Sequence, residues 1–486
     1  MRVLFIDIDS TNAGHLGCYG YHRNTSPNID DIAKEGTRFT NYYTSDAPCL
    51  PSRTALSTGQ FGIHNGVVGH GGTAGNIRQE GASRGFRDIL DTQSFPALFR
   101  SAGMKTALMS SFPERHSAWN FYTGFNEIYN TGKGGLETAE EVTPMVTKWL
   151  EENGSHDDWF LYVNYWDPHT PYLTPEEFGN PFVDDPLPGW LTEEVLKKHR
   201  KKVGPNSAQE VNMFSNHSRA DYPLYPGEIR DTTDLRKMVD GYDTGIRYVD
   251  YHIGKILNKL ESLDVKDDMC IIVTADHGEN MGEMGIYGEH GTADHATCRI
   301  PMIIRWPGAR QAHVDNGFHY HLDIVPTIAE MMEEPIHPKW EGRSFASALL
   351  TGSECGRDYL VFTQCAHVCQ RSVRFNNWLY IRTYHDGYHL FNKEMLFNLQ
   401  DDIYEQRDLA SINPDICNEG LRYLNEWHDY RMGAMSFDLD PLWTVIHEGG
   451  PYHVKGHLTS YIERLKETGR EDAVPELENR YPNELD

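Results

Sequence analysis

The chain has 486 residues, enough for one large α/β domain and a smaller second domain without disulfide or metal staples. Hydrophobic residues make up 39% and charged residues 24%, a composition that excludes a disordered chain. The formal net charge of −27 argues against a nucleic-acid partner, which would need a basic face, and favours a small anionic ester over a polyanionic polymer.

Strands and helices alternate over the first 305 residues. Residues 3–8 are an apolar, β-branched run of the kind that forms the buried middle of a parallel sheet. Further strands are predicted at residues 106–109, 159–165, 269–274 and 301–305, and helices from residue 27 and at residues 94–103, 142–152 and 238–263. This alternation predicts an α/β fold with a mostly parallel central sheet and helices on both faces.

Residues 174–232 interrupt this alternation with several prolines and few long apolar runs. We interpret them as an excursion from the sheet that lies near the active site. The sequence predicts a catalytic α/β domain over residues 1–350, including this excursion.

The remainder, residues 351–486, is predicted to be a smaller C-terminal α+β domain with an antiparallel sheet and a tail. Strands are expected at residues 372–383, 389–391 and 394–398, and a helix at residues 415–430. The acidic tail from residue 466 is expected to lie along the surface.

The cysteines and the N-terminus indicate the compartment. The eight cysteines show no paired Cys-x-x-Cys metal knuckle and no small-disulfide-scaffold spacing. The chain begins MRVLFIDIDS, directly in a strand, without the pattern of a signal peptide, although a chain that had lost such a peptide would look the same. No apolar stretch approaches the ~20 residues that span a bilayer. We expect a cytoplasmic protein with reduced thiols and no membrane partner.

The first functional signal is the stretch PCLPSRTALSTG, which places Cys49 just before a proline-started helix. Such a cysteine can be an ordinary buried residue. A side chain at a helix N-terminus also meets unpaired backbone N–H groups, which favour an anion. Arg53 follows one turn later with a planar guanidinium suited to an oxyanion. Cys49 and Arg53 are therefore candidate catalytic residues.

Carboxylates and a histidine follow two other predicted strands. Asp7 and Asp9 lie two residues apart at the end of the first strand and so share a face, although solvated or helix-capping carboxylates would look the same. Asp276 and His277 follow the strand at residues 269–274. Open α/β sheets bind ligands at the carboxyl ends of their strands, so these side chains predict a metal site. The predicted ligands are Asp9, Cys49, Asp276 and His277, with Asp7 as a further candidate.

Together these motifs resemble the sulfatase family of the alkaline-phosphatase-like superfamily. CLPSR, with the leucine and Thr-Gly that follow, resembles the signature Cys-x-Pro-Ser-Arg, in which a maturation enzyme oxidises the cysteine to formylglycine (3-oxoalanine). The stretches DSTNAGHLGCYGYHRNTSPNID, YWDPHTPY, RIPMIIRWPG and DIVPT resemble family segments in the same order. The resemblance extends from residue 1 to about residue 430 and implies a formylglycine-generating enzyme as a partner.

The sequence departs from the common family pattern in three places. Asp9 is followed by Ser10 rather than by a second aspartate, as in branches that include phosphonate monoester hydrolases. The usual Gly-Lys-Trp-His stretch is replaced by SSFPERH, and a lysine expected after the Asp-His-Gly corner is replaced by Glu289-His290. Each replacement can be merely structural. The candidates for the missing cationic contacts are Arg115, His116 and His290, and His70 in the VGHGG loop is a further candidate for the substrate pocket.

The resemblance implies hydrolysis of a sulfate monoester. One hydroxyl of hydrated formylglycine at position 49 would attack sulfur, with the metal and Arg53 lowering its charge, and the other would later expel sulfate. His169 of YWDPHTPY and His290 are the candidates for the acid that protonates the leaving alcohol. His116 is the candidate for the base that releases sulfate.

The predicted cofactor is one divalent cation per subunit. Carboxylate-rich coordination favours Ca²⁺, and the histidine keeps Mn²⁺ open. A phosphonate monoester or phosphodiester hydrolase would use the same site, because its transferred group carries the same single charge. A non-catalytic binding protein on a sulfatase scaffold is disfavoured because all the motif residues are present. The sequence leaves open the alcohol (sugar, aryl or alkyl) and the oligomeric state.

Overall fold

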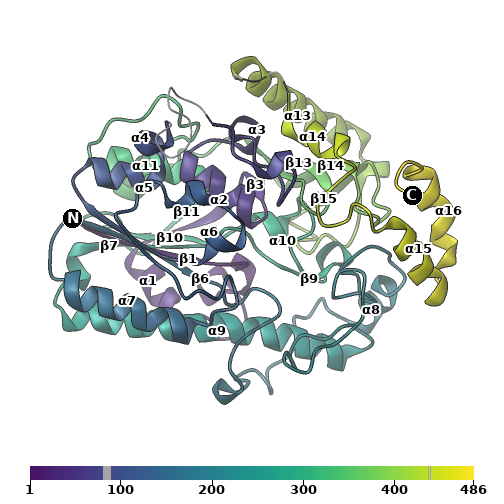
Figure 1. The fold of residues 1–486 in the computed structure, drawn as a ribbon, viewed down its shortest axis with the longest axis horizontal. Helices are drawn as coiled ribbons and strands as arrows, with labels where there is room; N and C mark the ends of the chain where they lie inside the picture. Colours follow the sequence, from purple (N-terminus) through teal and green to yellow (C-terminus); the bar gives the residue numbers. More distant parts are fainter. Residues whose placement is uncertain (80–88, 436, 438, 486) are drawn as a thin grey trace.

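An eight-stranded sheet forms the centre of the larger part of the molecule (Figure 1). The structure, a computed structural model, describes residues 1–79, 89–435, 437 and 439–485. The strand order is β11-β2-β10-β7-β1-β6-β4-β5, in which β10 runs antiparallel to β2 and β7 and the other neighbours are parallel. The strands are β1 (Arg2–Ile8), β2 (Thr37–Tyr43), β4 (Lys105–Met109), β5 (Glu127–Tyr129), β6 (Trp159–Tyr165), β7 (Met269–Thr274), β10 (Met302–Arg305) and β11 (His313–Tyr320). The predicted mostly parallel sheet is confirmed.

Strand β1 shows why the sheet is covered on both faces. Leu4 and Ile6 point into one apolar core, whereas Val3 and Phe5 point into another, because successive side chains of a strand alternate between faces. The first core is closed by α1 (Pro27–Glu35), α7 (Ala139–Asn153) and α9 (Thr232–Ser262), and the second by α2 (Cys49–Thr58), α5 (Phe95–Ser101), α11 (Ile324–Met331) and α12 (Ala346–Thr351). The predicted helices on both faces are therefore confirmed (Figure 1).

A second sheet has the order β15-β14-β13-β12-β3. Strands β12 (Tyr359–Gln364), β13 (Cys369–Phe375), β14 (Trp378–His385) and β15 (Glu394–Asn398) are antiparallel, which confirms the smaller antiparallel sheet. Its last strand, β3 (Asp46–Ala47), pairs in parallel with β12 and directly precedes the Cys49 region. The smaller sheet thus joins residues from both sides of residue 350, and a domain boundary at that position stays a prediction.

Two expectations for the C-terminal strands were wrong. The strand expected at residues 372–383 is a hairpin of β13 and β14, because the backbone turns at Asn376 with a φ of 46°. The strand expected at residues 389–391 is a loop, since Tyr388 and Leu390 have φ values of 71° and 56°, which extended strands do not adopt.

The C-terminal tail is also more ordered than expected. The predicted helix is present as α13 (Pro414–Ala434), which packs on the second sheet. The tail from residue 466 lies largely on the surface, as expected, but after the end of α15 (Leu458–Glu467) it also forms a helix, α16 (Val474–Arg480). Val474 and Leu477 are buried in a separate small core with Tyr388. Within the described residues, every helix is too short or too polar to span a bilayer.

Candidate active site

Four adjacent strands of the large sheet, β7, β1, β6 and β4, end at the same edge because they are parallel. Asp276 and His277 follow β7, and Asp9 follows β1. His169 comes after β6, and His116 comes after β4. A cavity of about 730 Å³ lies at this edge.

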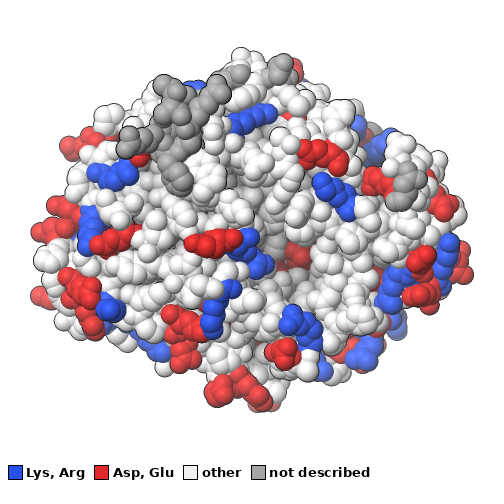
Figure 2. Space-filling view, in the orientation of Figure 1, with Lys and Arg blue, Asp and Glu red and all other residues white. Residues whose placement is uncertain are grey.

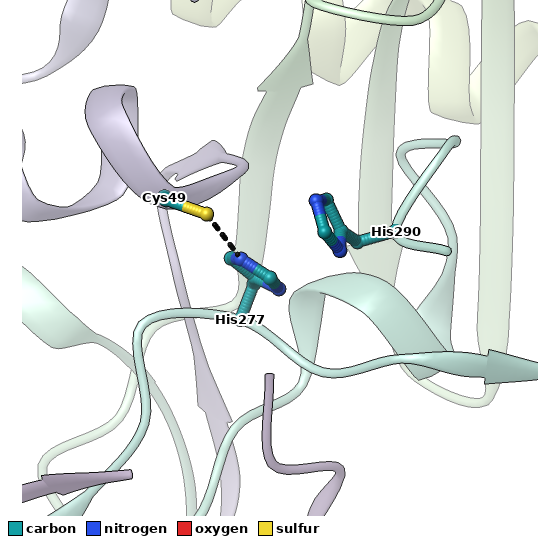
Figure 3. A group of neighbouring side chains, drawn as sticks. All are labelled: Cys49, His277 and His290. Atoms are coloured by element: carbon teal, nitrogen blue, oxygen red, sulfur yellow. Dashed lines mark hydrogen bonds between the residues drawn. The ribbon is translucent and has the colours of Figure 1, made fainter. Parts of the chain in front are cut away.

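Cys49 is the first residue of α2 and lies in this cavity. Its sulfur is 3.0 Å from Nε2 of His277, and Figure 3 shows Cys49, His277 and His290 converging from three separate segments. The sulfur marks the position that an oxygen of formylglycine would take. The thiol is 1% exposed, and burial together with the charge of Asp9 raises its pKa to about 12. An unmodified thiolate nucleophile is therefore disfavoured at neutral pH.

The structure brings four of the predicted metal ligands together. One ligand atom from each of Asp9, Cys49, Asp276 and His277 lies within 4.8 Å of the others, and all four residues are buried. Two carboxylates and an imidazole around one point suit a divalent cation. Asp7 is not in this group.

Arg53 lies between the carboxylates and is fully buried. Its Nε donates to Asp276 at 3.1 Å, its Nη2 donates to Asp9 at 2.8 Å, and its Nη1 donates to Asp7. Although burial alone would raise the pKa of Asp276, Arg53 and His277 hold that pKa below its ordinary value. The fork of Arg53 is therefore occupied by carboxylates, and Arg53 does not line the cavity.

Asp7 contacts Arg53 and lies outside the group of possible metal ligands. It also accepts a hydrogen bond from the hydroxyl of Tyr162, and its Oδ1 is buried without a hydrogen-bond partner. Burial raises the pKa of Asp7 to about 7.

Two backbone positions shape the loops that carry Asp9, Asp276 and His277. Ser10 has a φ of 56°, in the left-handed region, and its N–H and hydroxyl donate to Asp276 and Asp9 at 3.2 and 2.9 Å. Gly278 follows His277, and a Cβ there would lie 2.1 Å from the backbone oxygen of Ala296. Only glycine fits such an approach without a backbone shift.

Two histidines that the sequence analysis named as candidate site residues, His70 and His116, line the cavity together with Cys49. Nε2 of His70 accepts a hydrogen bond from the Leu50 N–H at 3.5 Å. The ring of His116 is 4.9 Å from that of His70, and its buried Nε2 has no hydrogen-bond partner among the described residues. Burial, with the charge of Arg115, lowers the pKa of His116 to about 3. His116 is thus neutral and has a free acceptor.

Arg115 and His169 line another part of the wall. The guanidinium of Arg115 lies over the ring of Trp166, and its Nη1 donates to the Gly134 carbonyl at 3.2 Å. His169 donates from Nδ1 to the Thr170 carbonyl at 2.5 Å, which leaves Nε2 for the cavity. Burial and the neighbouring His290 lower the pKa of His169 to about 4.

His290 is held by carboxylates on both sides. Its Nδ1 is 3.2 Å from Oε2 of Glu279, and its Nε2 is 2.9 Å from Oε1 of Glu289. Burial would lower the pKa of His290, but Glu289, the Cys49 sulfur and Glu279 raise it well above its ordinary value. Both ring nitrogens are engaged, so His290 has no N–H free for a leaving group.

Sequence motifs did not indicate much of the remaining wall. His367 and His453 come from the C-terminal part of the chain, where no pattern marked them, and the two rings stack at 4.4 Å. Side chains from the excursion at residues 174–232 also line the cavity. Those side chains are Asn206, Asn212, Met213, Arg219, Tyr222 and Tyr225.

Charge near the cavity differs from the overall acidity of −27. Figure 2 shows acidic and basic side chains interspersed on one face of the molecule, with basic side chains beside a central hollow. Arg115 and Arg219 both line the cavity. They can attract an anionic ligand locally although the protein as a whole repels it.

The sequence is similar to those of known proteins. Residues 2–334 match the family model described as Sulfatase. An N-acetylglucosamine-6-O-sulfatase of Bacteroides thetaiotaomicron is 22% identical over 408 residues, 72% of this chain and 70% of that protein. A choline-sulfatase of Rhizobium meliloti is 24% identical over 437 residues, 80% of this chain and 78% of that protein.

Two solved structures show the fold. One, in complex with its substrate D-glucosamine-2-N,6-O-disulfate, has a TM-score of 0.70 and 18% identity, and the match covers 91% of this chain and 99% of that chain. The other, a phosphonate monoester hydrolase of Agrobacterium radiobacter, has a TM-score of 0.68 and 19% identity, with 91% and 97% covered.

Proposed function

Because this chain belongs to the sulfatase family and is a sulfuric ester hydrolase, we propose that it hydrolyses a sulfate monoester through formylglycine formed from Cys49, beside one divalent cation. The observation that carries the proposal is that the CLPSR cysteine lies in the cavity, 3.0 Å from His277 and grouped with Asp9 and Asp276. The sequence neighbours of Cys49 and its spatial neighbours thus support the same chemistry.

The residues present fit a divalent cation. Asp9, Asp276 and His277 would hold it together with the side chain at position 49, and Arg53 orients both aspartates through hydrogen bonds. The carboxylate-rich donor set supports Ca²⁺, with Mn²⁺ as the alternative. When bound, such a cation lowers the charge on oxygens of the nucleophile and the sulfate group.

The formylglycine hydrate supplies two hydroxyls, one to form the bond to sulfur and one whose oxygen re-forms the aldehyde as sulfate leaves. A formylglycine-generating enzyme is the partner that this proposal requires. The raised pKa of the Cys49 thiol, about 12, supports the need for conversion, since the unmodified side chain is a poor nucleophile at neutral pH.

We assign the leaving-group proton to His169 rather than to His290. His169 donates Nδ1–H to a backbone carbonyl and lines the cavity, so Nε2 can carry the proton to the alcohol oxygen. Its low pKa rises when a negatively charged ester approaches, because the ester stabilises the imidazolium. His290 has both nitrogens bound to carboxylates.

We assign the base that releases sulfate to His116. Its Nε2 is buried, lacks a hydrogen-bond partner and belongs to a neutral ring, as a proton acceptor must. His70, Arg115 and Arg219 line the same cavity and support binding of an anionic ester.

The substrate class that we propose is a small sulfate ester of a sugar, with aryl and alkyl sulfates as the alternatives. The relatives named above include a sulfatase of an amino sugar and one of choline. A phosphonate monoester hydrolase is the second candidate, because Ser10 follows Asp9 and because the fold is similar to such an enzyme. All eight cysteines are free thiols, as a cytoplasmic location requires, and that location stays a prediction.

A substrate panel tests the proposal. Converted enzyme with Ca²⁺ is incubated with sulfated sugars, aryl sulfates, choline sulfate, phosphate diesters and phosphonate monoesters, and the released anion is measured. Cys49→Ala serves as the control for contaminating activity. We expect the highest kcat/KM on a sulfate monoester. A higher kcat/KM on a phosphonate monoester or phosphate diester than on every sulfate ester would establish the second candidate instead.

A further inference from the structure

A second group of metal-ligand side chains lies in the same cavity. One ligand atom from each of Glu289, His290 and His367 lies within 4.8 Å of the others, and all three residues line the cavity. Oε1 of Glu289 is 2.9 Å from Nε2 of His290 and 3.7 Å from Nε2 of His367. Ligand atoms about 2.1 Å from one Zn²⁺ ion are themselves about 3.0 to 3.7 Å apart at ordinary coordination angles.

We propose that Glu289, His290 and His367 form a second divalent-cation site, separate from the site at Asp9, and that its ion is of the Zn²⁺ type. Two imidazoles and one carboxylate are a donor set that zinc enzymes use with an open coordination position. The site beside Cys49 is richer in carboxylates and suits Ca²⁺. The two sites share no ligand.

Glu279 supplies the support that a metal-binding histidine needs. Its Oε2 is 3.2 Å from Nδ1 of His290, so the His290 Nδ1–H can be held there while Nε2 faces Glu289. A carboxylate behind a metal-bound imidazole is a recurring arrangement that orients the ring and raises its basicity. Glu279 is fully buried, and within the part of the chain that the structure describes its Oε1 has no hydrogen-bond partner.

The other histidine is equally well oriented. His367 stacks against His453 with ring centroids 4.4 Å apart, and His453 is fixed in turn by His70, whose Nδ1 is 2.9 Å from its Nε2. The rings of both proposed histidine ligands are therefore held by neighbouring side chains.

Charge balance gives the second cation a role. Glu289 lines the cavity in which the anionic ester must lie, and Glu279 lies behind His290, so two carboxyl groups flank that imidazole. A divalent ion at this triad would replace the proton between His290 and Glu289 and so neutralise the two carboxylates beside the ester. The rings of His277 and His290 are 4.1 Å apart, so the two cations would lie on adjacent sides of the cavity.

The test is a metal-binding measurement on converted enzyme. In unconverted enzyme the Cys49 sulfur could bind zinc together with His277 and His290, which would compete with the proposed site. Metal-free protein is saturated with Ca²⁺ and then titrated with Zn²⁺, and bound metals are counted after gel filtration. We expect one Zn²⁺ per chain in the presence of Ca²⁺. His367→Gln and Glu289→Gln should lose this zinc and keep Ca²⁺, and Glu279→Gln should weaken zinc affinity by about 10- to 100-fold.

Two controls separate the sites. Asp9→Asn should lose Ca²⁺ and keep zinc, and His453→Gln, which removes a neighbouring imidazole that is not a ligand, should keep both. Circular dichroism and Tm identify a variant that fails to fold. In the unmutated enzyme, anomalous scattering at the zinc edge provides a second measurement, with a peak expected between Glu289 and His367.

The proposal is overturned if the Ca²⁺-loaded enzyme binds no zinc or if the anomalous peak lies at Asp9. Unchanged zinc binding in folded His367→Gln and Glu289→Gln would also overturn it. These readouts do not depend on turnover, so the second site can fail while the proposed sulfate ester hydrolysis stands.

Discussion

Conversion of Cys49 can be separated experimentally from catalysis by the thiol itself. The perturbation is production of the protein with and without a formylglycine-generating enzyme. We expect activity to be proportional to the fraction of aldehyde at position 49, measured by peptide mass and by hydrazine capture. Cys49→Ser should give at most one slow turnover, because a serine ester has no second hydroxyl with which to expel sulfate.

The magnitude for the unconverted thiol follows from its surroundings. Burial and the charge of Asp9 raise the pKa of Cys49 from 9.0 to about 12. At pH 8 this shift makes the thiolate fraction about a thousandfold smaller than that of an unperturbed cysteine. In metal-free protein, alkylation by iodoacetamide should therefore be slower by about the same factor, and its rate should still be rising at pH 10.

Site-resolved mass spectrometry measures this rate at Cys49. Denatured protein gives the intrinsic rate, and the partly exposed Cys355 provides an internal reference in the folded chain. An alkylation profile that levels off below pH 8, or sustained turnover by fully unconverted enzyme, would refute the reasoning.

Three further predictions test the ligand assignment, the acid and the backbone beside His277. Asp276→Ala should abolish turnover and the Ca²⁺ bound beside Cys49, whereas Asp7→Ala should keep that Ca²⁺ because Asp7 lies outside the ligand group. Calcium analysis showing the reverse order would contradict the ligand assignment. His169→Ala should lower kcat on an alkyl or sugar sulfate by about 10² or more and barely change it on an aryl sulfate with a good leaving group, and an unchanged rate on the alkyl ester would eliminate its role as the acid. Gly278→Ala, whose Cβ would lie 2.1 Å from a backbone oxygen, should lower the free energy of urea unfolding by about 1 to 3 kcal/mol. Gly433→Ala, whose Cβ would meet no atom within 4 Å, should not lower it, and equal effects of the two substitutions would refute the steric argument.

Local sequence was enough to predict the large sheet and to place candidate site residues at its edge. Apolar runs with the right flanking residues marked β1 and β7, and the polar residues directly after them identified Asp9, Asp276 and His277. Because β1 and β7 are parallel neighbours, loops more than 250 residues apart in sequence meet at one edge, as the strand pattern implies. Cys49 was predictable because its motif is contiguous.

The role of Arg53 was decided only by packing. Its place one turn after Cys49 puts it on the same side of α2 but does not say what its fork contacts. The tertiary structure surrounds Arg53 with Asp7, Asp9 and Asp276. Its guanidinium therefore binds these three carboxylates and not a ligand in the cavity. Partner choice among buried charges depends on the distances between elements, which local periodicity does not contain.

The far wall of the cavity was likewise beyond the sequence. His367 lies in the loop between β12 and β13, and that loop reaches the cavity because β3, just before Cys49, pairs with β12 in the second sheet. A two-residue strand and a loop histidine carry almost no local pattern. They come together because backbone hydrogen bonds join the sheet edge to the helix that begins at Cys49, and only the folded chain shows that those bonds form.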